Sequence, residues 1–255
     1  MAHMDLGLTD RVYLVTGAAR GLGRAVAQVL VDEGARVVVS GRHADSVDAA
    51  VQALGADRAL GVVADNADPS TPQALVDAAV SGFGRLDGAL VSVGGPPPGS
   101  VTATTDDQWR AAFESVLLGG VRMGRTVAAS LGEGGAIAFV LSTSVKAPIP
   151  GLATSNGLRP GLAMVAKQLA DEYGPAGVRV VGLMPGRIGT ERLDELDALS
   201  GDAAASRARW EAMIPLRRYG EPAEFARVAA FVLSPAASFV TGSMVAVDGG
   251  LLASL

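Results

Sequence analysis

The stretch VYLVTGAARGLG, at residues 12–23, combines a short apolar run with three closely spaced glycines. The apolar run predicts a buried strand, and the apolar residues from Ala25 to Leu30 recur at helical spacing until Gly34 ends the helix. Glycines between a strand and a helix let the backbone turn sharply and approach a pyrophosphate, whose charge the free N–H groups of the helix start attract. The order G-x-x-x-G-x-G in this context therefore predicts a dinucleotide site that includes Gly17, Arg20, Gly21, Leu22 and Gly23.

Seven short runs rich in β-branched residues alternate along the chain with segments of helical periodicity. Strands that alternate with helices favour a parallel sheet, and near-continuous apolar runs are typical of strands covered on both faces. We therefore predict an α/β fold with a doubly wound, parallel, seven-stranded sheet, a Rossmann fold. The strands are expected from Val12, Arg36, Leu60, Gly88, Ala136, Val178 and Met244, and the helices after the first from about Ala44, Thr71, Thr105, Leu162 and Glu221.

The 255 residues show no Ser/Pro-rich linker, no break in composition and no repeat, so we expect one domain over residues 1–255. Residues 191–215 stand apart, because a polar, acidic, Ala/Ser-rich segment from Glu191 to Arg209 follows the end of a predicted strand. Two interpretations stay open for this part: a lid over a substrate pocket, or an ordinary helical insertion at the surface. We interpret residues 1–4, which carry a second start-like methionine, as a cloning remnant.

Composition narrows the classes of function. The formal net charge is −5 with no basic block, which argues against a nucleic-acid partner. No apolar run approaches the roughly 18 residues of a membrane span, and the N-terminus lacks a secretion signal, so we expect a cytoplasmic protein with no membrane partner. With no cysteine and only two histidines, we expect neither a metal centre nor a Ser-His-Asp triad.

The end of the second predicted strand, Ser40-Gly41-Arg42, bears on the choice of cofactor. A carboxylate at this place would bind an adenosine ribose hydroxyl and repel a 2′-phosphate. The sequence has no carboxylate there, and Arg42 with Arg20 could bind the phosphate, so NADP(H) is favoured over NAD(H). The alternative is that both arginines are solvated surface charges. Asp65, after the third strand, is expected to accept a hydrogen bond from the adenine, although a carboxylate there is also a common turn former.

Two later motifs, together with the glycine loop, make the chain resemble the short-chain dehydrogenase/reductase family along essentially its whole length. Thr16–Gly23 matches the family pattern TGxxxGxG, Pro185–Thr190 resembles PGxIxT, and Val247–Gly250 resembles the C-terminal DGG. The resemblance implies an oxidoreductase acting on a small-molecule carbonyl or alcohol, nearest to the 3-oxoacyl-acyl-carrier-protein reductases, and a homo-oligomer, a tetramer or dimer. It also implies cofactor contacts from Pro185 and Gly186, nicotinamide contacts from Ile188 and Thr190, and backbone contacts from Ser92 and Gly94.

The family's catalytic set is altered in this chain. The family uses a Tyr-x-x-x-Lys pair, a serine upstream of the tyrosine, and an asparagine on the preceding helix. In register, the tyrosine and lysine positions fall on Ser155 and Arg159, the serine on Ser142 and the asparagine on Val116. Only the serine agrees, so the resemblance assigns catalysis to Ser142, Ser155 and Arg159. These departures resemble a divergent subgroup that keeps the fold without a complete catalytic set.

Two functions stay open on this basis. An oxidoreductase could use Ser142 and Ser155 as hydrogen-bond donors to a substrate carbonyl and Arg159 as a fixed positive charge. The alternative is a catalytically impaired dinucleotide-binding sensor or scaffold subunit. A purely structural interpretation is also open, in which Thr154 or Ser155 caps a helix and Arg159 is solvated. Pro160 disfavours helical dihedral angles at Arg159, which leaves open whether Ser155 and Arg159 lie one helical turn apart.

Overall fold

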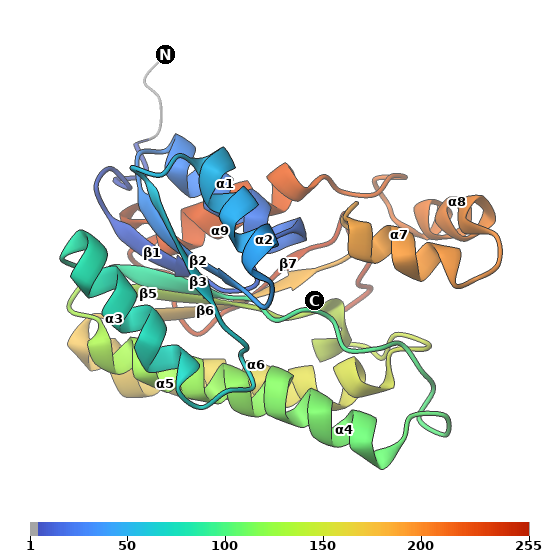
Figure 1. The fold of residues 1–255 in the computed structure, drawn as a ribbon. Helices are drawn as coiled ribbons and strands as arrows, with labels where there is room; N and C mark the ends of the chain where they lie inside the picture. The colour runs from blue at the N-terminus through green and yellow to red at the C-terminus, as the bar shows by residue number, and fades with distance from the viewer. Residues whose placement is uncertain (1–4, 255) are drawn as a thin grey trace.

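The structure, a computed structural model, describes residues 5–254, so the expected cloning remnant at residues 1–4 lies outside the described part. Seven parallel strands form one sheet in the order β3-β2-β1-β4-β5-β6-β7 (Figure 1). The predicted doubly wound Rossmann sheet is confirmed. Its strand order reverses between β1 and β4, which is where open sheets of this kind bind ligands, beyond the carboxyl ends of the strands. The strands are β1 (Val12–Val15), β2 (Arg36–Gly41), β3 (Ala59–Val63), β4 (Gly88–Val91), β5 (Ala136–Val140), β6 (Arg179–Pro185) and β7 (Met244–Val247).

Two layers of helices cover the sheet (Figure 1). One layer contains α1 (Gly21–Asp32), α2 (Ala44–Leu54) and α9 (Pro222–Leu233), and the other contains α3 (Thr71–Phe83), α5 (Gly119–Ser130) and α6 (Ala153–Tyr173).

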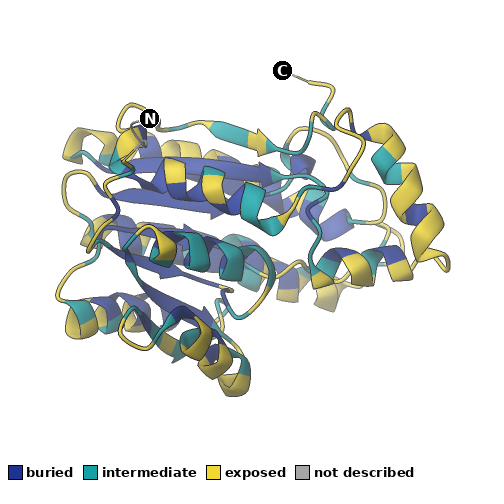
Figure 2. Cartoon of the chain, turned by 90° about the horizontal axis from the view of Figure 1, so that it is seen from above, coloured by how far each residue is buried: buried dark blue, intermediate teal, exposed yellow. Residues whose placement is uncertain are grey.

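Each strand supplies side chains to both layers, because successive residues of a strand point to opposite faces. In β1, Tyr13 and Val15 belong to the core under α1 and α9, whereas Val12 and Leu14 belong to the core under α3, α5 and α6. The central strands are therefore buried on both faces, as Figure 2 shows.

The helix α6 differs from the prediction, because it begins at Ala153 rather than near Leu162 and runs through Pro160 without interruption. A proline inside a helix costs about 3 kcal/mol or more. Packing offsets this cost, since Leu158 is buried in a cluster with Val116, and Leu162 and Ala166 are buried in the core. The question that Pro160 left open is thus answered, because Ser155 and Arg159 lie on one continuous helix.

The segment from Thr105 to Ser130 contains an irregular turn. Thr105 caps α4 (Asp106–Ala112) by accepting from Gln108 N–H, while Gln108 Oε1 accepts from Thr105 N–H. A π-helical turn, Phe113–Leu118, then joins α4 to α5. Such turns are frequent at functional sites.

Two short helices, α7 (Glu191–Ala198) and α8 (Ala203–Met213), occupy the polar segment that stood apart in the sequence. They project beyond the sheet at the end where the strands terminate, and much of their surface is exposed (Figures 1 and 2). Within residues 5–254, no helix combines the length and the apolar character that crossing a bilayer would require.

Candidate functional site

The glycine loop after β1 has a backbone shape and a close packing that only glycine allows at several positions. Gly17 and Gly21 adopt left-handed backbone conformations, with φ of 61° and 57°. A Cβ atom on Gly17 would lie 2.9 Å from the backbone oxygen of Ser92, and one on Gly23 would lie 2.6 Å from the backbone oxygen of Gly17. The loop therefore cannot accept side chains at Gly17 or Gly23 without moving. The side chain of Arg20, at the N-cap of α1, accepts no hydrogen bond from the first N–H groups of the helix.

The ends of β1 and β4 are joined at the strand reversal. The Thr16 hydroxyl donates to the Ser92 carbonyl oxygen (2.7 Å) and accepts from the Ser92 N–H (2.8 Å), and both residues are buried. Ser92 therefore contributes to the site first by fixing the glycine loop against β4, while Gly94 follows as an exposed residue on the connection.

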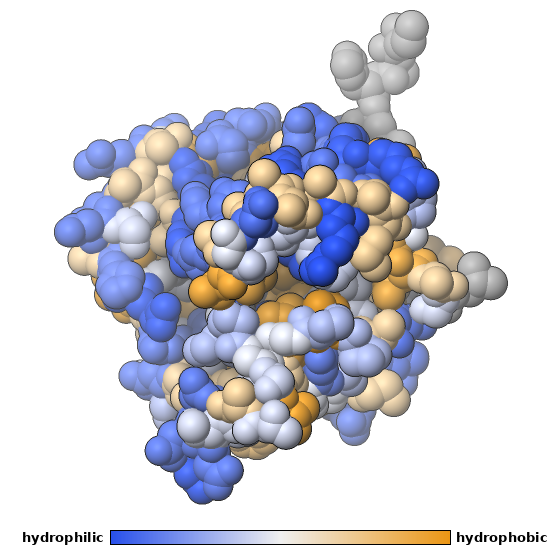
Figure 3. Space-filling model, turned by 90° about the vertical axis from the view of Figure 1, so that its right-hand side faces the viewer, coloured by the Kyte–Doolittle hydropathy of each residue, from blue (hydrophilic) through white to orange (hydrophobic). Residues whose placement is uncertain are grey.

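The predicted Pro185–Thr190 motif follows β6 and lies across from the glycine loop. We call the space between the two the crevice. A Cβ atom on Gly21 would lie 3.8 Å from Thr190 Cγ2, and one on Gly186 would lie 2.6 Å from Asp248 Cβ. Ile188 is buried and pairs with Gly220. The structure thus brings Thr190 beside the glycine loop. Figure 3 looks onto this end of the molecule and shows a hollow between its two halves, with apolar surface on the rim.

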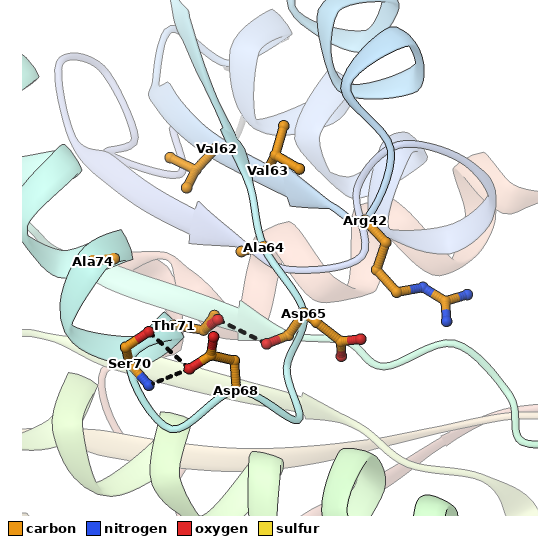
Figure 4. A pocket seen from close by; sticks show the side chains of 9 residues that line it. All are labelled: Arg42, Val62, Val63, Ala64, Asp65, Asp68, Ser70, Thr71 and Ala74. Atoms are coloured by element: carbon orange, nitrogen blue, oxygen red, sulfur yellow. Dashed lines mark hydrogen bonds between the residues drawn. The ribbon is translucent and has the colours of Figure 1, made fainter.

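A separate hollow of about 320 Å³ lies where β2 and β3 end (Figure 4). Arg42 and Asp65 both line it, and their charged groups extend to the same side. Thr71 fixes the backbone of this region, because its hydroxyl donates to the Asp65 carbonyl oxygen at 2.7 Å.

Arg20 does not line the hollow that contains Arg42. Its Nη1 lies 3.1 Å from Glu195 Oε1 in α7, and both side chains are largely exposed. The side chain of Arg192, also in α7, donates to the Pro96 carbonyl oxygen at 2.9 Å. The helix α7 therefore contacts both the glycine loop and the proline-rich connection after β4. The residues in each of these two contacts lie far apart in the sequence, and no sequence pattern predicts that they meet.

The three residues that the family resemblance assigns to catalysis lie after the end of β5 and near the start of α6. Ser155 and Arg159 lie one turn apart in α6, and each is 6% exposed. Arg159 Nη1 donates to the Val140 carbonyl oxygen at 2.6 Å. Burial lowers the pKa of the Arg159 guanidinium to about 10, so it stays protonated at neutral pH. The interpretation of Arg159 as a solvated residue is wrong.

A third serine, Ser144, completes this cluster. The hydroxyls of Ser144 and Ser155 are hydrogen-bonded at 3.1 Å, whereas Ser142 Oγ accepts from the Ser144 N–H at 3.1 Å. Sequence analysis missed Ser144; its place two residues after Ser142, in the same loop, is the only signal that could have found it. Neither Thr154 nor Ser155 caps α6, because the helix begins earlier, with Leu152 at the capping position.

Val116, which the register of the resemblance places at the family's asparagine, lies in an apolar environment. Val116 lies in the π-helical turn, is 1% exposed, and packs with Ala112 and Leu158. This position therefore offers no side chain for a proton relay.

The comparisons with known proteins agree with this geometry. A family model described as enoyl-(acyl carrier protein) reductase matches residues 17–252. A cis-4-hydroxycyclohexanecarboxylate dehydrogenase from Sinomonas cyclohexanicum is 34% identical over 256 residues, covering 98% of this chain and 100% of the relative. The chain belongs to the short-chain dehydrogenase/reductase family.

Two further members show how broad the similarity is. The chain is 34% identical over 257 residues to a levodione reductase from Leifsonia aquatica, covering 95% of this chain and 94% of the relative. It also superimposes on the crystal structure of L-sorbose reductase from Gluconobacter frateurii, complexed with NADPH and L-sorbose, with a TM-score of 0.93 at 28% identity, covering 99% and 100% of the two chains.

In this short-chain dehydrogenase/reductase, the hollow at Arg42 follows β2 and β3, the glycine loop follows β1, and Thr190 follows β6, all at the carboxyl ends of the strands. The glycine backbone of the loop and the start of α1, which no side chain caps, fit a pyrophosphate bound there. Within residues 5–254, no group of three His, Cys, Asp or Glu side chains is placed to hold a metal ion.

Proposed function

We propose that the chain transfers a hydride between NADP(H) and a carbonyl or secondary alcohol, as a 3-oxoacyl-acyl-carrier-protein reductase-like enzyme with a non-standard active site. The observation that carries the cofactor choice is the hollow at the ends of β2 and β3. Arg42 lines it, and Ser40-Gly41 ends β2 without a carboxylate that would repel a 2′-phosphate. Asp65, on the same hollow, would accept a hydrogen bond from the adenine.

The dinucleotide supplies or accepts the hydride when bound, and the serine cluster would handle the substrate oxygen. Ser142 Oγ already accepts a hydrogen bond from the Ser144 N–H, so its own hydrogen is free to be donated to a substrate carbonyl. Arg159 would stabilise negative charge that develops on that oxygen, because a protonated guanidinium nearby favours an alkoxide. Ser155 shares its hydrogen bond with Ser144 and would act through that pair.

The altered residues limit the rate. A serine hydroxyl is a much weaker acid than a phenol, and Arg159 is protonated throughout the neutral range. The proton would therefore come from water or from a group on the substrate. Loss of a positioned acid typically costs about 10²- to 10⁴-fold in rate, so we expect slow turnover.

We also propose that α7 and α8 act as a lid over the substrate, on the strength of the contacts that α7 makes with the glycine loop and with the proline-rich connection after β4. A homo-oligomeric state, tetramer or dimer, and a cytoplasmic location are proposed on the family resemblance and the composition.

A second candidate is a dinucleotide-binding sensor or scaffold subunit. The buried valine at position 116 and the hydroxyl pair of Ser144 and Ser155 favour it, because neither provides a proton relay.

The test is NADPH oxidation by the purified protein across a panel of ketones and 3-oxoacyl thioesters, with Ser155→Ala and Arg159→Ala beside it. The enzyme proposal predicts slow turnover that both variants lose while they retain NADPH affinity. If NADPH binds and no substrate is reduced, the sensor is favoured; if NADPH does not bind, both proposals fail.

A further inference from the structure

Asp197, in α7, is a buried carboxylate at the meeting point of several segments. It is 4% exposed, and both of its oxygens have partners. Oδ2 accepts from the Tyr219 hydroxyl at 2.9 Å, and Oδ1 accepts from the Ser206 hydroxyl at 2.8 Å. Oδ1 also lies 3.4 Å from Arg187 Nη1. Asp197, in α7, thus contacts Ser206 in α8, Tyr219, and Arg187 in the Pro185–Thr190 motif.

Arg187 carries this network into the candidate cofactor loop, since it lies between Gly186 and Ile188. Its guanidinium carbon stands 3.7 Å from the centre of the Trp210 ring in α8, which is the close distance of a cation–π contact. The side chain is only 14% exposed. One arginine in the loop therefore contacts both helices of the segment, α7 through Asp197 and α8 through Trp210.

Tyr219 supports the same loop from the other side. Burial, and then its hydrogen bond to Asp197, raise the pKa of Tyr219 to about 12, so its hydroxyl remains a donor at neutral pH. The next residue, Gly220, accepts from the Gly189 N–H (2.8 Å) and donates to the Arg187 carbonyl oxygen (2.9 Å). A Cβ atom on Gly220 would lie 2.6 Å from Ile188 Cδ1. Side-chain and backbone bonds therefore fix residues 187–189 together.

We infer that Asp197 is a positioning residue, which docks α7 and α8 onto the loop carrying Ile188 and Thr190 so that the helices and the loop move as one body. This inference rests on the proposed function and on the nicotinamide contacts that the family resemblance implies for Ile188 and Thr190. The buried carboxylate is matched by one cation and two hydroxyl donors, and removing its charge leaves Arg187 buried without a counter-charge. Loss of Asp197 should therefore loosen the helices and weaken the hold of the loop on the cofactor.

The matched pair of variants is Asp197→Asn and Asp194→Asn. Both remove one negative charge from α7, but Asp194 is exposed, and its side chain takes part in no hydrogen bond or ion pair among the described residues. Trypsin can report on the segment directly, because Arg192, Arg207 and Arg209 lie in α7 and α8. Proteolysis follows the population of the open form when opening is fast.

We expect Asp197→Asn to be cut after these arginines at least about tenfold faster than the unchanged protein, and to bind NADPH at least about fivefold more weakly by calorimetry. Asp194→Asn should match the unchanged protein in the cutting rate. Because Asp194 lines a hollow with Gly21 and Thr190, the control for NADPH affinity is Glu172→Gln, at an exposed residue of α6 whose side chain has no partner among the described residues. Tyr219→Phe removes one hydrogen-bond donor to Asp197 and leaves the charges in place, so its cutting rate and NADPH affinity should lie between those of Asp197→Asn and the unchanged protein. This variant also tests the inference if Asp197→Asn does not fold.

Equal cutting rates in the unchanged protein and in the folded variants would overturn the inference. Faster cutting with unchanged NADPH affinity would also overturn it, since Asp197 would then hold the helices without positioning the loop. A different result would contradict the proposed function, namely that the unchanged protein does not bind NADPH. That result would overturn both the proposed function and this inference.

Discussion

Arg159 and Val140 are joined by a 2.6 Å hydrogen bond from Nη1 of the arginine to the backbone oxygen that ends β5. This bond ties α6 to the strand that precedes Ser142, and it holds a buried positive charge at the position where the resemblance places the family's lysine. The arginine therefore serves the fold through this bond and, in the proposed function, also supplies the positive charge of the site.

The first prediction concerns this double role. Arg159→Met should lower the free energy of unfolding by about 1–3 kcal/mol, because it leaves the Val140 carbonyl oxygen without its donor. Urea unfolding monitored by circular dichroism measures the change. Arg125→Met is the control, since Arg125 is exposed on α5 and should change stability by less than about 0.5 kcal/mol. Equal stability of the two variants would contradict the buried bond.

The second prediction concerns the glycine loop. Gly17→Ala should both destabilise the protein and abolish NADPH binding, because Gly17 has φ of 61° and its new Cβ would lie 2.9 Å from the Ser92 backbone oxygen. Thermal unfolding and a calorimetric titration measure the two effects. Gly132→Ala is the comparison, as a Cβ at Gly132 meets nothing within 4 Å. Normal NADPH binding by Gly17→Ala would show that the loop does not hold the cofactor closely.

The third prediction concerns the substrate oxygen. Ser142→Ala should lower the turnover number about tenfold or more with little change in NADPH affinity, because Ser142 Oγ only accepts a hydrogen bond, from the Ser144 N–H, and its own hydrogen can be donated to the substrate. Ser144→Ala should have a smaller effect on turnover, since its hydroxyl bonds to Ser155. Steady-state kinetics on any ketone found to be reduced distinguishes them. The reverse order of effects would make Ser144 the donor.

The fourth prediction concerns alkaline pH. Burial is the main cause that raises the pKa of both Tyr13 and Tyr219 to about 12. A folded-state pKa above the unfolded value near 10 gives stability that is complete below pH 10 and is lost as pH rises toward 12. Tyr219→Phe should therefore show a shallower loss of stability between pH 10 and 12 in urea unfolding. Tyr173→Phe, in a partly exposed position, is the control. Parallel curves for Tyr219→Phe and the unchanged protein would refute the tyrosine assignment.

The strands themselves and the glycine loop could be predicted from sequence because both are local signals. Each strand is a short apolar run. The sharp turn after β1 needs glycine for its backbone conformation, whatever the rest of the fold packs around it. The start of α6 could not be predicted from sequence. The helix continues through Pro160 because Leu158 and Leu162 pack against segments that are distant in the sequence.

The contacts of the candidate site were equally hidden from local signals. Arg20 pairs with Glu195, which lies 175 residues later, and Asp197 bonds to Tyr219, 22 residues away. The hydroxyl pair of Ser144 and Ser155 forms only once the loop after β5 folds over α6. Motif spacing identifies the residues that a family shares, but the partners of substituted residues depend on tertiary packing.

The most direct test of the account is a calorimetric titration of NADPH and NADH into the protein and into Arg42→Ala. We expect the unchanged protein to bind NADPH more tightly than NADH, and Arg42→Ala to lose about tenfold or more of its NADPH affinity while NADH is almost unaffected. If neither nucleotide binds the unchanged protein at millimolar concentration, or if Arg42→Ala weakens both equally, the crevice at the strand ends does not hold NADP(H) as proposed.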